Sequence, residues 1–547
     1  MRLPRSISRT AVVRAAVAGA VVVVAVVIGF LVWPKDDGPS APSAASHSPT
    51  PTPAATGPLS KPPRTIPAVR DFDAARGPGW RPVHTARVIA DPSGPLGEST
   101  RILARDLDLK TASGPARRGD VELRLGRDGG SDGGHDGGQD SGQDGGPESY
   151  TMTTRDGRVV ITGADEAGAF YGTRTVVQAV RSGGQVPEGT VRDRPDRPQR
   201  GLNLDIARKF FDADWIEARL REMADLKLNQ LCLHFSDDQG FRIESSSHPE
   251  IVSDQHLTKA QLRHITDLAS SLHIEVIPEI DSPGHLGAVF KAHPGLELRN
   301  AAGRPARGAA DISDKKAADL VDDLLREYAP LFPGPYTHLG GDEYLALMAS
   351  DPESSYPGLA EAARTKYGPD AKVQDLATGW LNDRAATVGS LGGKAKVWND
   401  GVHAGGVVAT DKNREIEYWT GTELGARDPL EYLKEGRKLV NLNDEFLYYV
   451  LGQPNQFRYP TGQRIYEQWS PAVLRGTKPV PASLAGPDRV LGGRLAVWGD
   501  IPGAQTTEQV ARGIRLPLRA VAQKLWDPRK PQLPWKEFTA LADRVEH

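Results

Sequence analysis

The sequence predicts an α/β protein in which a (β/α)8 barrel of the TIM type follows a small α+β domain and an N-terminal transmembrane segment. Beyond residue 196, eight short apolar runs each end in a polar or aromatic residue, and helical patterns separate several of them. An uncharged stretch lies close to the N-terminus, behind four arginines. The 547 residues are too many for one compact core, so we expect at least two folded domains.

Residues 1–37 have the pattern of a basic tail followed by a membrane anchor. Segment 15–33 is uncharged, and its 19 residues approach the ~20 that a helix needs to cross a bilayer. The arginines before this stretch, with Asp36 and Asp37 after it, favour a cytoplasmic N-terminus and an extracellular remainder. We therefore expect a single-pass protein of the cell membrane. A cleaved signal peptide, which would leave a secreted protein, is the alternative.

Residues 38–67 are rich in proline, serine and threonine, which favours an extended linker. Residues 68–195 predict the α+β domain, because TARVIA and VELRLG alternate like strands and two further strands flank Asp156-Gly157, a strong hairpin signal. The stretch EAGAFYGTRTVVQAV then has helical apolar spacing. Segment 127–147 has abundant glycine and no apolar residue, so we expect a disordered loop there.

Residues 196–547 predict the barrel. Its expected strands are GLNLDIAR, LNQLCLHFSDD, HIEVIPEID, YTHLGGDE, KAKVWND, EIEYWTG, KLVNLND and RLAVWGD. Helices such as DWIEARLREMADL, which we expect to be capped by Asp214, lie between several of them. In a (β/α)8 barrel the C-terminal strand ends form one mouth, and the active site lies there.

Composition excludes some classes of function. The net charge of −3 gives no indication of a nucleic-acid partner. Cys232 is the one cysteine, so an internal disulfide is excluded. Its position inside the apolar run QLCLHF favours a small buried side chain over a nucleophile or a metal ligand.

Four ordered motifs, RGLNLDIARKF, HFSDDQGFRIE, PGH and HLGGDEY, resemble glycoside hydrolase family 20, the β-N-acetylhexosaminidases. The resemblance covers residues 200 to about 525, and the 68–195 domain resembles the family's usual N-terminal domain. It implies exo-acting hydrolysis of terminal non-reducing GlcNAc or GalNAc β-glycosides. The implied partner is therefore a carbohydrate, and no cofactor and no metal are implied.

Asp342 and Glu343 are neighbours in HLGGDEY. Retaining glycosidases of the common kind need two carboxyl groups ~5 Å apart across the bond, and adjacent residues on a strand point apart. The resemblance implies substrate-assisted catalysis instead, in which the 2-acetamido oxygen attacks C1 and forms an oxazolinium ion. Glu343 would then be the general acid and base, and Asp342 would orient the acetamido group. We further expect the Asp342 anion to raise the pKa of Glu343.

The resemblance also implies roles for other residues at the strand ends. Arg208 would hold the 3- and 4-hydroxyls of the sugar, and Asp500 would bind a 4- or 6-hydroxyl. Asp237 and His285 would form a pair that tunes Glu343. The aromatic walls around the N-acetyl group would be Trp398, Trp419 and Trp498.

Two positions depart from the family pattern. Many relatives carry Glu where Asp500 stands, which leaves the preference between GlcNAc and GalNAc open. Relatives also place a tyrosine hydroxyl on the acetamido oxygen. In NDEFLYYVLG, Phe446 falls at that position, and of the nearby tyrosines Tyr448 and Tyr449 we choose Tyr448.

Two alternative functions remain. A lacto-N-biosidase would use the same chemistry on a disaccharide unit. A catalytically inactive, membrane-tethered carbohydrate-binding protein is an alternative of another class, against which the intact Asp342-Glu343 pair argues. A metal site made by His338 and Asp342 is disfavoured, because their spacing brings ligands together on a helix and this segment reads as strand and turn.

Overall fold

The computed structural model describes residues 57–126, 145–421 and 426–546. The predicted membrane anchor, most of the predicted linker and most of segment 127–147 lie outside these residues. Within the described ranges, no helix is both long and apolar enough to span a bilayer.

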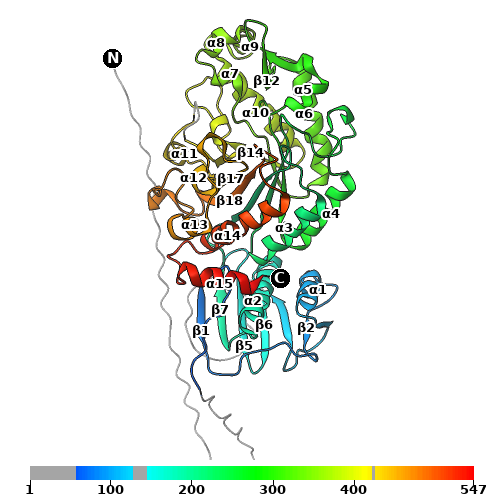
Figure 1. Cartoon of the computed structure of the whole chain (residues 1–547), viewed down its shortest axis with the longest axis vertical. Coiled ribbons are helices and arrows are strands. Elements are labelled where there is room, and N and C mark those ends of the chain that lie inside the picture. The colour runs from blue at the N-terminus through cyan, green and yellow to red at the C-terminus, as the bar shows by residue number, and fades with distance from the viewer. Residues whose placement is uncertain (1–56, 127–144, 422–425, 547) are drawn as a thin grey trace, which may run out of the picture. The chain divides into compact units, whose positions relative to one another are not determined.

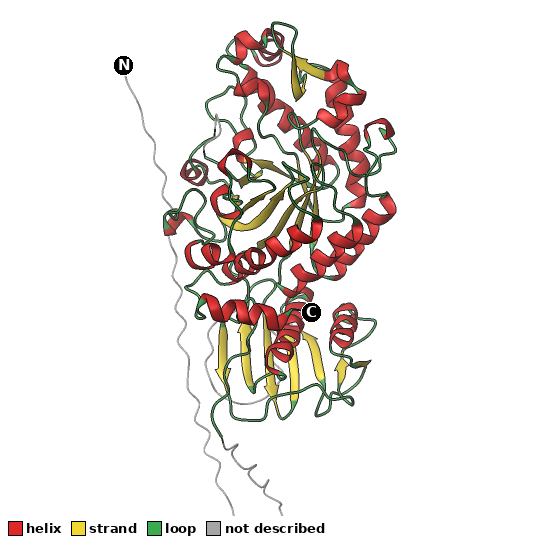
Figure 2. Ribbon diagram, in the orientation of Figure 1, coloured by secondary structure: helices red, strands yellow, loops and turns green. Residues whose placement is uncertain are grey.

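The small domain is built on a mixed seven-stranded sheet in the order β1-β7-β5-β6-β4-β2-β3 (Figures 1 and 2). Strands β1, β7, β5 and β6 pair antiparallel, and β6, β4, β2 and β3 pair parallel. Helices α1 and α2 pack against the sheet. The elements are β1 (Asp71–Ala74), β2 (Arg87–Ile89), α1 (Gly97–Asp106), β3 (Lys110–Ala112), β4 (Val121–Leu125), β5 (Tyr150–Arg155), β6 (Arg158–Gly163), α2 (Glu166–Gly183) and β7 (Gly189–Asp193).

The predicted hairpin is confirmed, and the predicted start of the domain is too late. Strands β5 and β6 pair across Asp156 and Gly157, whose φ angles of 54° and 69° suit a two-residue turn. Ile66, at the end of the predicted linker, is fully buried, and its N–H donates to Oε1 of Gln178 in α2 at 2.7 Å. The last residues of segment 38–67 are therefore part of the folded domain.

Eight parallel strands form a closed barrel, so the predicted (β/α)8 architecture is confirmed. Their order is β8-β9-β10-β13-β14-β15-β16-β18, and β18 pairs with both β16 and β8 to close the ring. Each of the eight predicted apolar runs supplies one strand. These are β8 (Gln199–Asp205), β9 (Gln230–Ser236), β10 (Glu275–Ile280), β13 (Tyr336–His338), β14 (Lys394–Trp398), β15 (Glu415–Tyr418), β16 (Leu439–Asn441) and β18 (Val490–Trp498).

Helices surround the barrel strands, and the last helix, α15, packs against α2 of the small domain (Figures 1 and 2). The helices are α3 (Ala213–Asp225), α4 (Lys259–Ser271), α5 (Gly287–Ala292), α6 (Lys315–Tyr328), α7 (Leu345–Met348), α8 (Pro352–Ser355), α9 (Pro357–Tyr367), α10 (Val373–Ser390), α11 (Pro429–Lys434), α12 (Asp444–Leu447), α13 (Gly462–Gln468), α14 (Thr507–Trp526) and α15 (Trp535–Val545). The prediction that Asp214 caps α3 is wrong. The cap is Asp212, whose side chain accepts from the N–H of Trp215, so Asp214 lies in the first turn.

Short elements occupy several of the connections. They are η1 (Pro249–Ile251), η2 (Pro294–Leu296), the hairpin of β11 (Glu297–Arg299) and β12 (Pro305–Ala310), η3 (Ala329–Leu331), η4 (Asn399–Gly401), β17 (Tyr448–Val450), η5 (Pro454–Gln456) and η6 (Ala482–Leu484). The fully described stretch between β14 and β15 contains η4 and no α-helix. One crossover helix of the regular pattern is therefore replaced by a loop, which begins at the end of β14 and returns to the start of the parallel strand β15.

Buried ion pairs join the small domain to the barrel. Arg200 of β8 is fully buried and places two guanidinium nitrogens 2.8 and 3.0 Å from the carboxylate of Glu148. Lys227, which follows α3, lies 3.0 Å from Oδ2 of Asp193 at the end of β7. Because buried charges require partners, each side of this contact depends on the other.

Candidate active site

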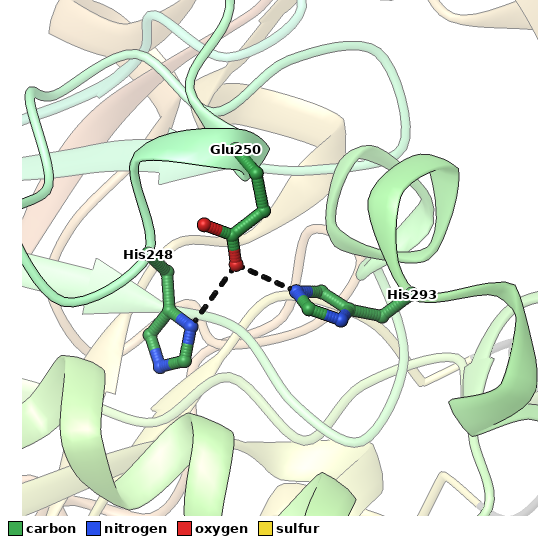
Figure 3. A group of neighbouring side chains, drawn as sticks. All are labelled: His248, Glu250 and His293. Atoms are coloured by element: carbon green, nitrogen blue, oxygen red, sulfur yellow. Dashed lines mark hydrogen bonds and ion pairs between the residues drawn. The ribbon is translucent and has the colours of Figure 1, made fainter.

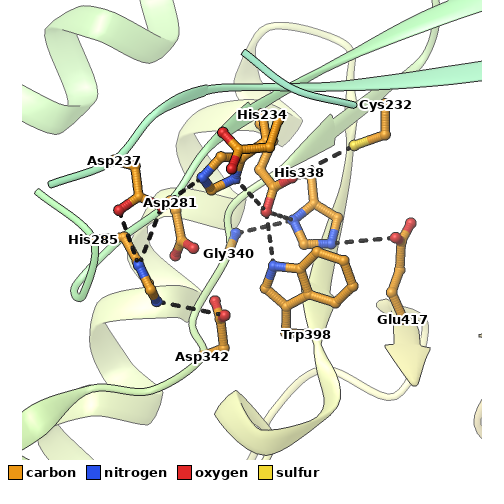
Figure 4. A network of polar contacts seen from close by, with 12 residues as sticks. Cys232, His234, Asp237, Asp281, His285, His338, Gly340, Asp342, Trp398 and Glu417 are labelled. Carbon is orange, nitrogen blue, oxygen red and sulfur yellow. Dashed lines mark hydrogen bonds and ion pairs between the residues drawn. The ribbon is translucent and has the colours of Figure 1, made fainter. Parts of the chain in front are cut away.

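The ends of β9 and β13 bring acidic side chains to His285, which follows the strand between them, β10. Its Nδ1 lies 3.4 Å from Oδ1 of Asp237, which follows β9. Its Nε2 lies 3.6 Å from Oδ2 of Asp342 and 3.5 Å from Oε2 of Glu343, both of which follow β13. The structure therefore brings together the predicted catalytic pair and the predicted Asp237–His285 pair. Figure 4 shows Asp237, His285 and Asp342 of this group.

Arg208 lies beside this group. Its guanidinium contacts Oδ2 of Asp237 at 2.7 Å and Oδ2 of Asp205 at 3.1 Å. It also lies 5.5 Å from the ring centre of Trp498. Burial disfavours the charge on Arg208, but the surrounding carboxylates outweigh burial and raise its pKa. These carboxylates are Asp205, Asp237 and Asp500, of which Asp500 is solvent-exposed just beyond β18. Arg208 is thus a fixed cation with a planar set of donors.

The turn that carries the acidic pair requires glycine. Gly340 and Gly341 have φ angles of 68° and 101°, and Glu343 itself has a φ of 48°. A Cβ on Gly340 would lie 1.6 Å from Oδ1 of Asp281. Two backbone N–H groups are held by carboxylates, that of Gly341 by Asp281 at 2.9 Å and that of Glu343 by Asp400 at 3.0 Å. The left-handed turn is therefore fixed from both sides.

The expected rise in the pKa of Glu343 is wrong for the free site. A hydrogen bond from His285 holds the pKa of Glu343 below its usual value. Burial opposes charge on His285, but three carboxylates outweigh burial and raise its pKa well above the usual value; they are Asp237, Asp342 and Asp281. Burial raises the pKa of Asp342. The cause of the error is His285, whose positive charge acts on Glu343 more strongly than the neighbouring carboxylate does.

Asp342 has a buried acceptor that no N–H satisfies. Its side chain shares a hydrogen bond with the neighbouring carboxyl of Asp281, and its Oδ1 accepts from no N–H among the described residues. A buried acceptor without a donor costs free energy, so this atom is suited to receive an N–H from a ligand.

Four aromatic side chains form one cluster at the mouth. Trp398, Trp419, Tyr448 and Trp498 are between 1 and 8% exposed and belong to one apolar group. The rings of Trp419 and Tyr448 are parallel, with their centres 5.7 Å apart. Trp498 lies 5.9 Å from Trp398 and 5.7 Å from Tyr448. The three predicted tryptophan walls are thus brought together with Tyr448.

The two candidate tyrosines occupy different environments. Burial, together with Asp444, Asp342 and Asp400, raises the pKa of Tyr448 well above its usual value, so its phenol remains a proton donor. Tyr449 instead donates to Oε1 of Gln505 at 3.0 Å. Only Tyr448 has the carboxylates of the mouth as neighbours.

Asp400 is a site residue that sequence reasoning missed. Its Oδ1 accepts from Nε1 of Trp419 at 2.9 Å, while its Oδ2 accepts from the N–H of Glu343. Burial and the neighbouring Asp342 raise the pKa of Asp400 to about 7. Asp400 thereby joins the turn that carries the acid to an aromatic wall. The strand-end position in KAKVWND was the available signal.

A buried polar network lies behind the mouth (Figure 4). Glu279 accepts from Nε1 of Trp398 at 2.7 Å and lies 3.2 Å from Nδ1 of His234 and 3.5 Å from Nδ1 of His338. His234 in turn lies 2.8 Å from Oδ2 of Asp237. The network therefore connects Trp398 to the Asp237–His285 pair. Cys232 is buried here, as predicted, with its thiol 3.7 Å from Glu279.

Three further carboxylates at the strand ends are buried. Asp205, Glu279 and Asp281 are each no more than 1% exposed. Asp205 accepts from the N–H of Arg208 at 2.9 Å, and Asp281 accepts from the N–H of Gly341. Both carboxylates therefore hold the backbone beside the predicted site residues.

Comparison with known families decides the classification. The model for "Glycosyl hydrolase family 20, catalytic domain" matches residues 198–529, and that for "Glycosyl hydrolase family 20, domain 2" matches residues 62–194. The chain belongs to glycoside hydrolase family 20. This family 20 protein is 28% identical to a lacto-N-biosidase of Bifidobacterium bifidum over 471 residues, which cover 86% of the chain and 40% of that relative. It is 31% identical to a beta-N-acetylhexosaminidase of Cellulomonas fimi, over 53% of the chain and 64% of that relative.

Solved structures show the same fold. A mutant beta-hexosaminidase of Streptomyces plicatus, in complex with its product GlcNAc, matches with a TM-score of 0.68 at 24% identity, covering 90% of this family 20 chain and 95% of that one. An exo beta-N-acetylglucosaminidase of Vibrio harveyi matches with a TM-score of 0.69 at 18% identity, covering 91% and 79%. The chain spans less than two thirds of the length of the two curated relatives described above.

Proposed function

We propose that this chain is an exo-acting β-N-acetylhexosaminidase that hydrolyses terminal non-reducing GlcNAc or GalNAc β-glycosides with retention of configuration. The observation that carries the proposal is the buried Oδ1 of Asp342, which accepts from no described N–H, in a side chain whose charge acts on Tyr448 of the aromatic cluster. A buried carboxylate oxygen next to apolar walls suits an acetamido group, which offers one N–H and one methyl group.

In the first step the acetamido group supplies the nucleophile. Its carbonyl oxygen forms a bond to C1, the bond from C1 to the leaving oxygen breaks, and Glu343 gives its proton to that oxygen. Asp342 accepts from the acetamido N–H and stabilises the positive charge of the oxazolinium ion. Tyr448 donates to the acetamido oxygen, and the tryptophan walls keep that oxygen under C1.

In the second step Glu343 takes a proton from water, which attacks C1 and opens the oxazolinium ring. Two inversions at C1 give net retention. Glu343 must be protonated before the first step, although His285 lowers its pKa in the free site. A bound sugar expels water around Glu343, which raises its pKa towards the form that the acid step needs.

The decisive test of the substrate class compares nitrophenyl β-glycosides of GlcNAc, GalNAc and glucose. We expect hydrolysis of the first two and very slow or no hydrolysis of the glucoside, because its 2-hydroxyl cannot replace the acetamido nucleophile. An oxazoline mimic with sulfur in the ring should inhibit competitively and bind more tightly than substrate. Comparable rates on the glucoside, or a covalent adduct on a carboxylate, would contradict the mechanism.

The role of Glu343 is tested by Glu343→Gln. We expect activity on natural glycosides to fall by roughly 10²–10⁴-fold, the usual size of general-acid assistance, with a smaller loss on aryl glycosides whose leaving groups need no proton. Rates should be measured on both substrate types at one pH. An equal loss on both, or unchanged rates, would argue against Glu343 as the acid. No hydrolysis of either substrate type by the unchanged chain would support an inactive carbohydrate-binding protein.

Lacto-N-biosidase activity is a second candidate, favoured by the match to the Bifidobacterium protein over most of this chain. Asp500 adds to this candidate, because its side chain is one methylene shorter than Glu and is exposed at the mouth. Release of intact lacto-N-biose from its nitrophenyl β-glycoside would support it. Release of GlcNAc alone from the simpler substrate would favour the first candidate.

We further propose that the N-terminal segment anchors the protein in the cell membrane with the barrel outside. The apolar stretch 15–33 after four arginines supports this proposal. Full-length protein should sediment with membranes and resist a salt wash. A shortened form in the medium would identify the segment as a cleaved signal peptide instead.

A further inference from the structure

Three metal-ligating side chains converge away from the residues of the proposed mechanism (Figure 3). His248 directly precedes η1, Glu250 lies inside η1, and His293 follows the last residue of α5. Oε1 of Glu250 lies 3.3 Å from Nδ1 of His248 and 2.8 Å from Nε2 of His293. The three ligand atoms all lie within 4.8 Å of one another.

The spacing of these atoms suits a small divalent cation. Zinc binds histidine nitrogen and carboxylate oxygen at ~2.0–2.2 Å, so ligands at the corners of a tetrahedron lie roughly 3.3 Å apart. Two histidines with one glutamate are a known zinc ligand set, which leaves a fourth position for water. The side chain of Glu250 is 42% exposed, so that fourth position can reach solvent.

The surroundings of His248 give a second, independent indication. Its Nε2 is buried, has no hydrogen-bond partner among the described residues, and lies 3.8 Å from Oδ2 of Asp323 in α6. If the neutral ring donated from Nδ1 to Glu250, Nε2 would present a lone pair towards a carboxylate. A metal ion on Nδ1 leaves the proton on Nε2, where it faces Asp323. This carboxylate–histidine arrangement commonly orients metal-bound imidazole.

We propose that His248, Glu250 and His293 bind one zinc ion that ties the connection after β9 to the end of α5. That connection begins next to Asp237, and α5 begins two residues after His285. Bound zinc stabilises the folded chain, because the unfolded chain does not hold the three ligands together. The site goes beyond the sequence prediction of no metal, and its three ligands are separated along the chain by up to 45 positions, from 248 to 293.

Zinc content and zinc affinity of the full chain test the proposal. After removal of metal with a chelator and return of Zn²⁺, we expect about one zinc per chain by elemental analysis. His293→Ala and Glu250→Gln should each lower the zinc affinity at least about tenfold by titration calorimetry. Glu250→Gln keeps the shape and the acceptor for the two imidazoles, so it separates metal binding from folding. Asp323→Asn should lower the affinity by about 10–100-fold, the usual effect of losing a partner of this kind.

The matched control is His264→Ala, since His264 is an exposed histidine on α4. It should bind zinc as the unchanged chain does, and zinc should raise the Tm of both. Zinc should not raise the Tm of His293→Ala. The proposal is overturned if the unchanged chain takes up no zinc, or if Glu250→Gln and His293→Ala both retain its affinity. The second outcome would place the metal at another cluster, such as Asp281, His285 and Asp342.

Discussion

His285 controls the charge of the candidate active site. It is surrounded by carboxylates from the ends of β9, β10 and β13, and it contacts both members of the Asp342-Glu343 pair. Its own pKa is raised well above the usual value, so the ring is a cation under ordinary conditions. The acid of the proposed mechanism therefore has a positive neighbour in the free enzyme.

Replacing His285 should change the pH dependence of hydrolysis. In His285→Gln the pKa of Glu343 should rise, because a neutral amide replaces the charged donor that lowers it. The protonated fraction of Glu343 falls as pH rises through its pKa, so the alkaline limb of kcat/KM should move to higher pH. The profile is measured with an aryl GlcNAc substrate, and His264→Gln serves as control. An alkaline limb that stays in place or moves lower would contradict this role.

Sequence reasoning named most of the residues that the structure brings together at the candidate site, but it did not predict their charges. Arg208, Asp237, His285 and Trp498 could be identified because each lies in a motif or at the end of an apolar run. The direction of the pKa shift on Glu343 depends on where the His285 ring lies, which no local pattern specifies. The choice between Tyr448 and Tyr449 likewise depends on which neighbour faces the barrel mouth.

The turn after β13 is the element on which the proposed chemistry depends. Two glycines and Glu343 adopt left-handed conformations there, and carboxylates from two other connections hold the N–H groups of Gly341 and Glu343. Glu343 is thus positioned by backbone contacts rather than by its own side chain. Glu343 can therefore gain or lose its proton while its backbone stays in the same position.

Gly340→Ala should damage both stability and activity. The left-handed conformation costs a residue with a Cβ about 1–2 kcal/mol, and the new Cβ would overlap Asp281. We expect a lower urea midpoint and a large fall in kcat. Gly389→Ala is the matched control, because Gly389 lies in the last turn of α10 with no atom within 4 Å of its added Cβ. If Gly340→Ala behaves like this control, the turn is not constrained as described.

Apolar runs predicted all eight barrel strands, because a buried parallel strand needs few polar residues. They could not show that the β14–β15 crossover lacks an α-helix, since loop conformation there is set by contacts such as that of Asp400 with Glu343. The cap of α3 was misplaced by two residues because Asp212 and Asp214 both satisfy the cap pattern. The convergence of His248, Glu250 and His293 is a tertiary feature with no sequence spacing of its own.

At the scale of the whole molecule, the buried pair of Arg200 and Glu148 couples the two domains. Arg200 is fully buried, also contacts the ring of Trp526, and has the Glu148 carboxylate as its charged partner in a salt bridge. Such a pair adds little net stability by itself, but losing one member leaves an uncompensated charge. The barrel thus tolerates this arginine only while the small domain is in place.

Glu148→Ala should lower the free energy of unfolding by about 3–5 kcal/mol, the usual cost of breaking a buried ion pair. The measurement is urea unfolding followed by tryptophan fluorescence. Glu98→Ala removes a carboxylate from an exposed pair with Arg101 and should cost no more than about 1 kcal/mol. If the two substitutions lower the free energy of unfolding equally, the buried ion pair between the domains contributes no more stability than an exposed one.

The reactivity of the Cys232 thiol can be used to measure how often the barrel opens. It is fully buried in β9, and burial together with Glu279 raises its pKa well above the usual value. Thiol reagents attack the exposed thiolate, so a probe such as a disulfide dye can react only in molecules whose barrel has opened. Because the chain has 1 cysteine, the rate at which the dye is released measures how often the barrel around this thiol opens. In native buffer, without denaturant, that rate gives the free energy of the rare open state.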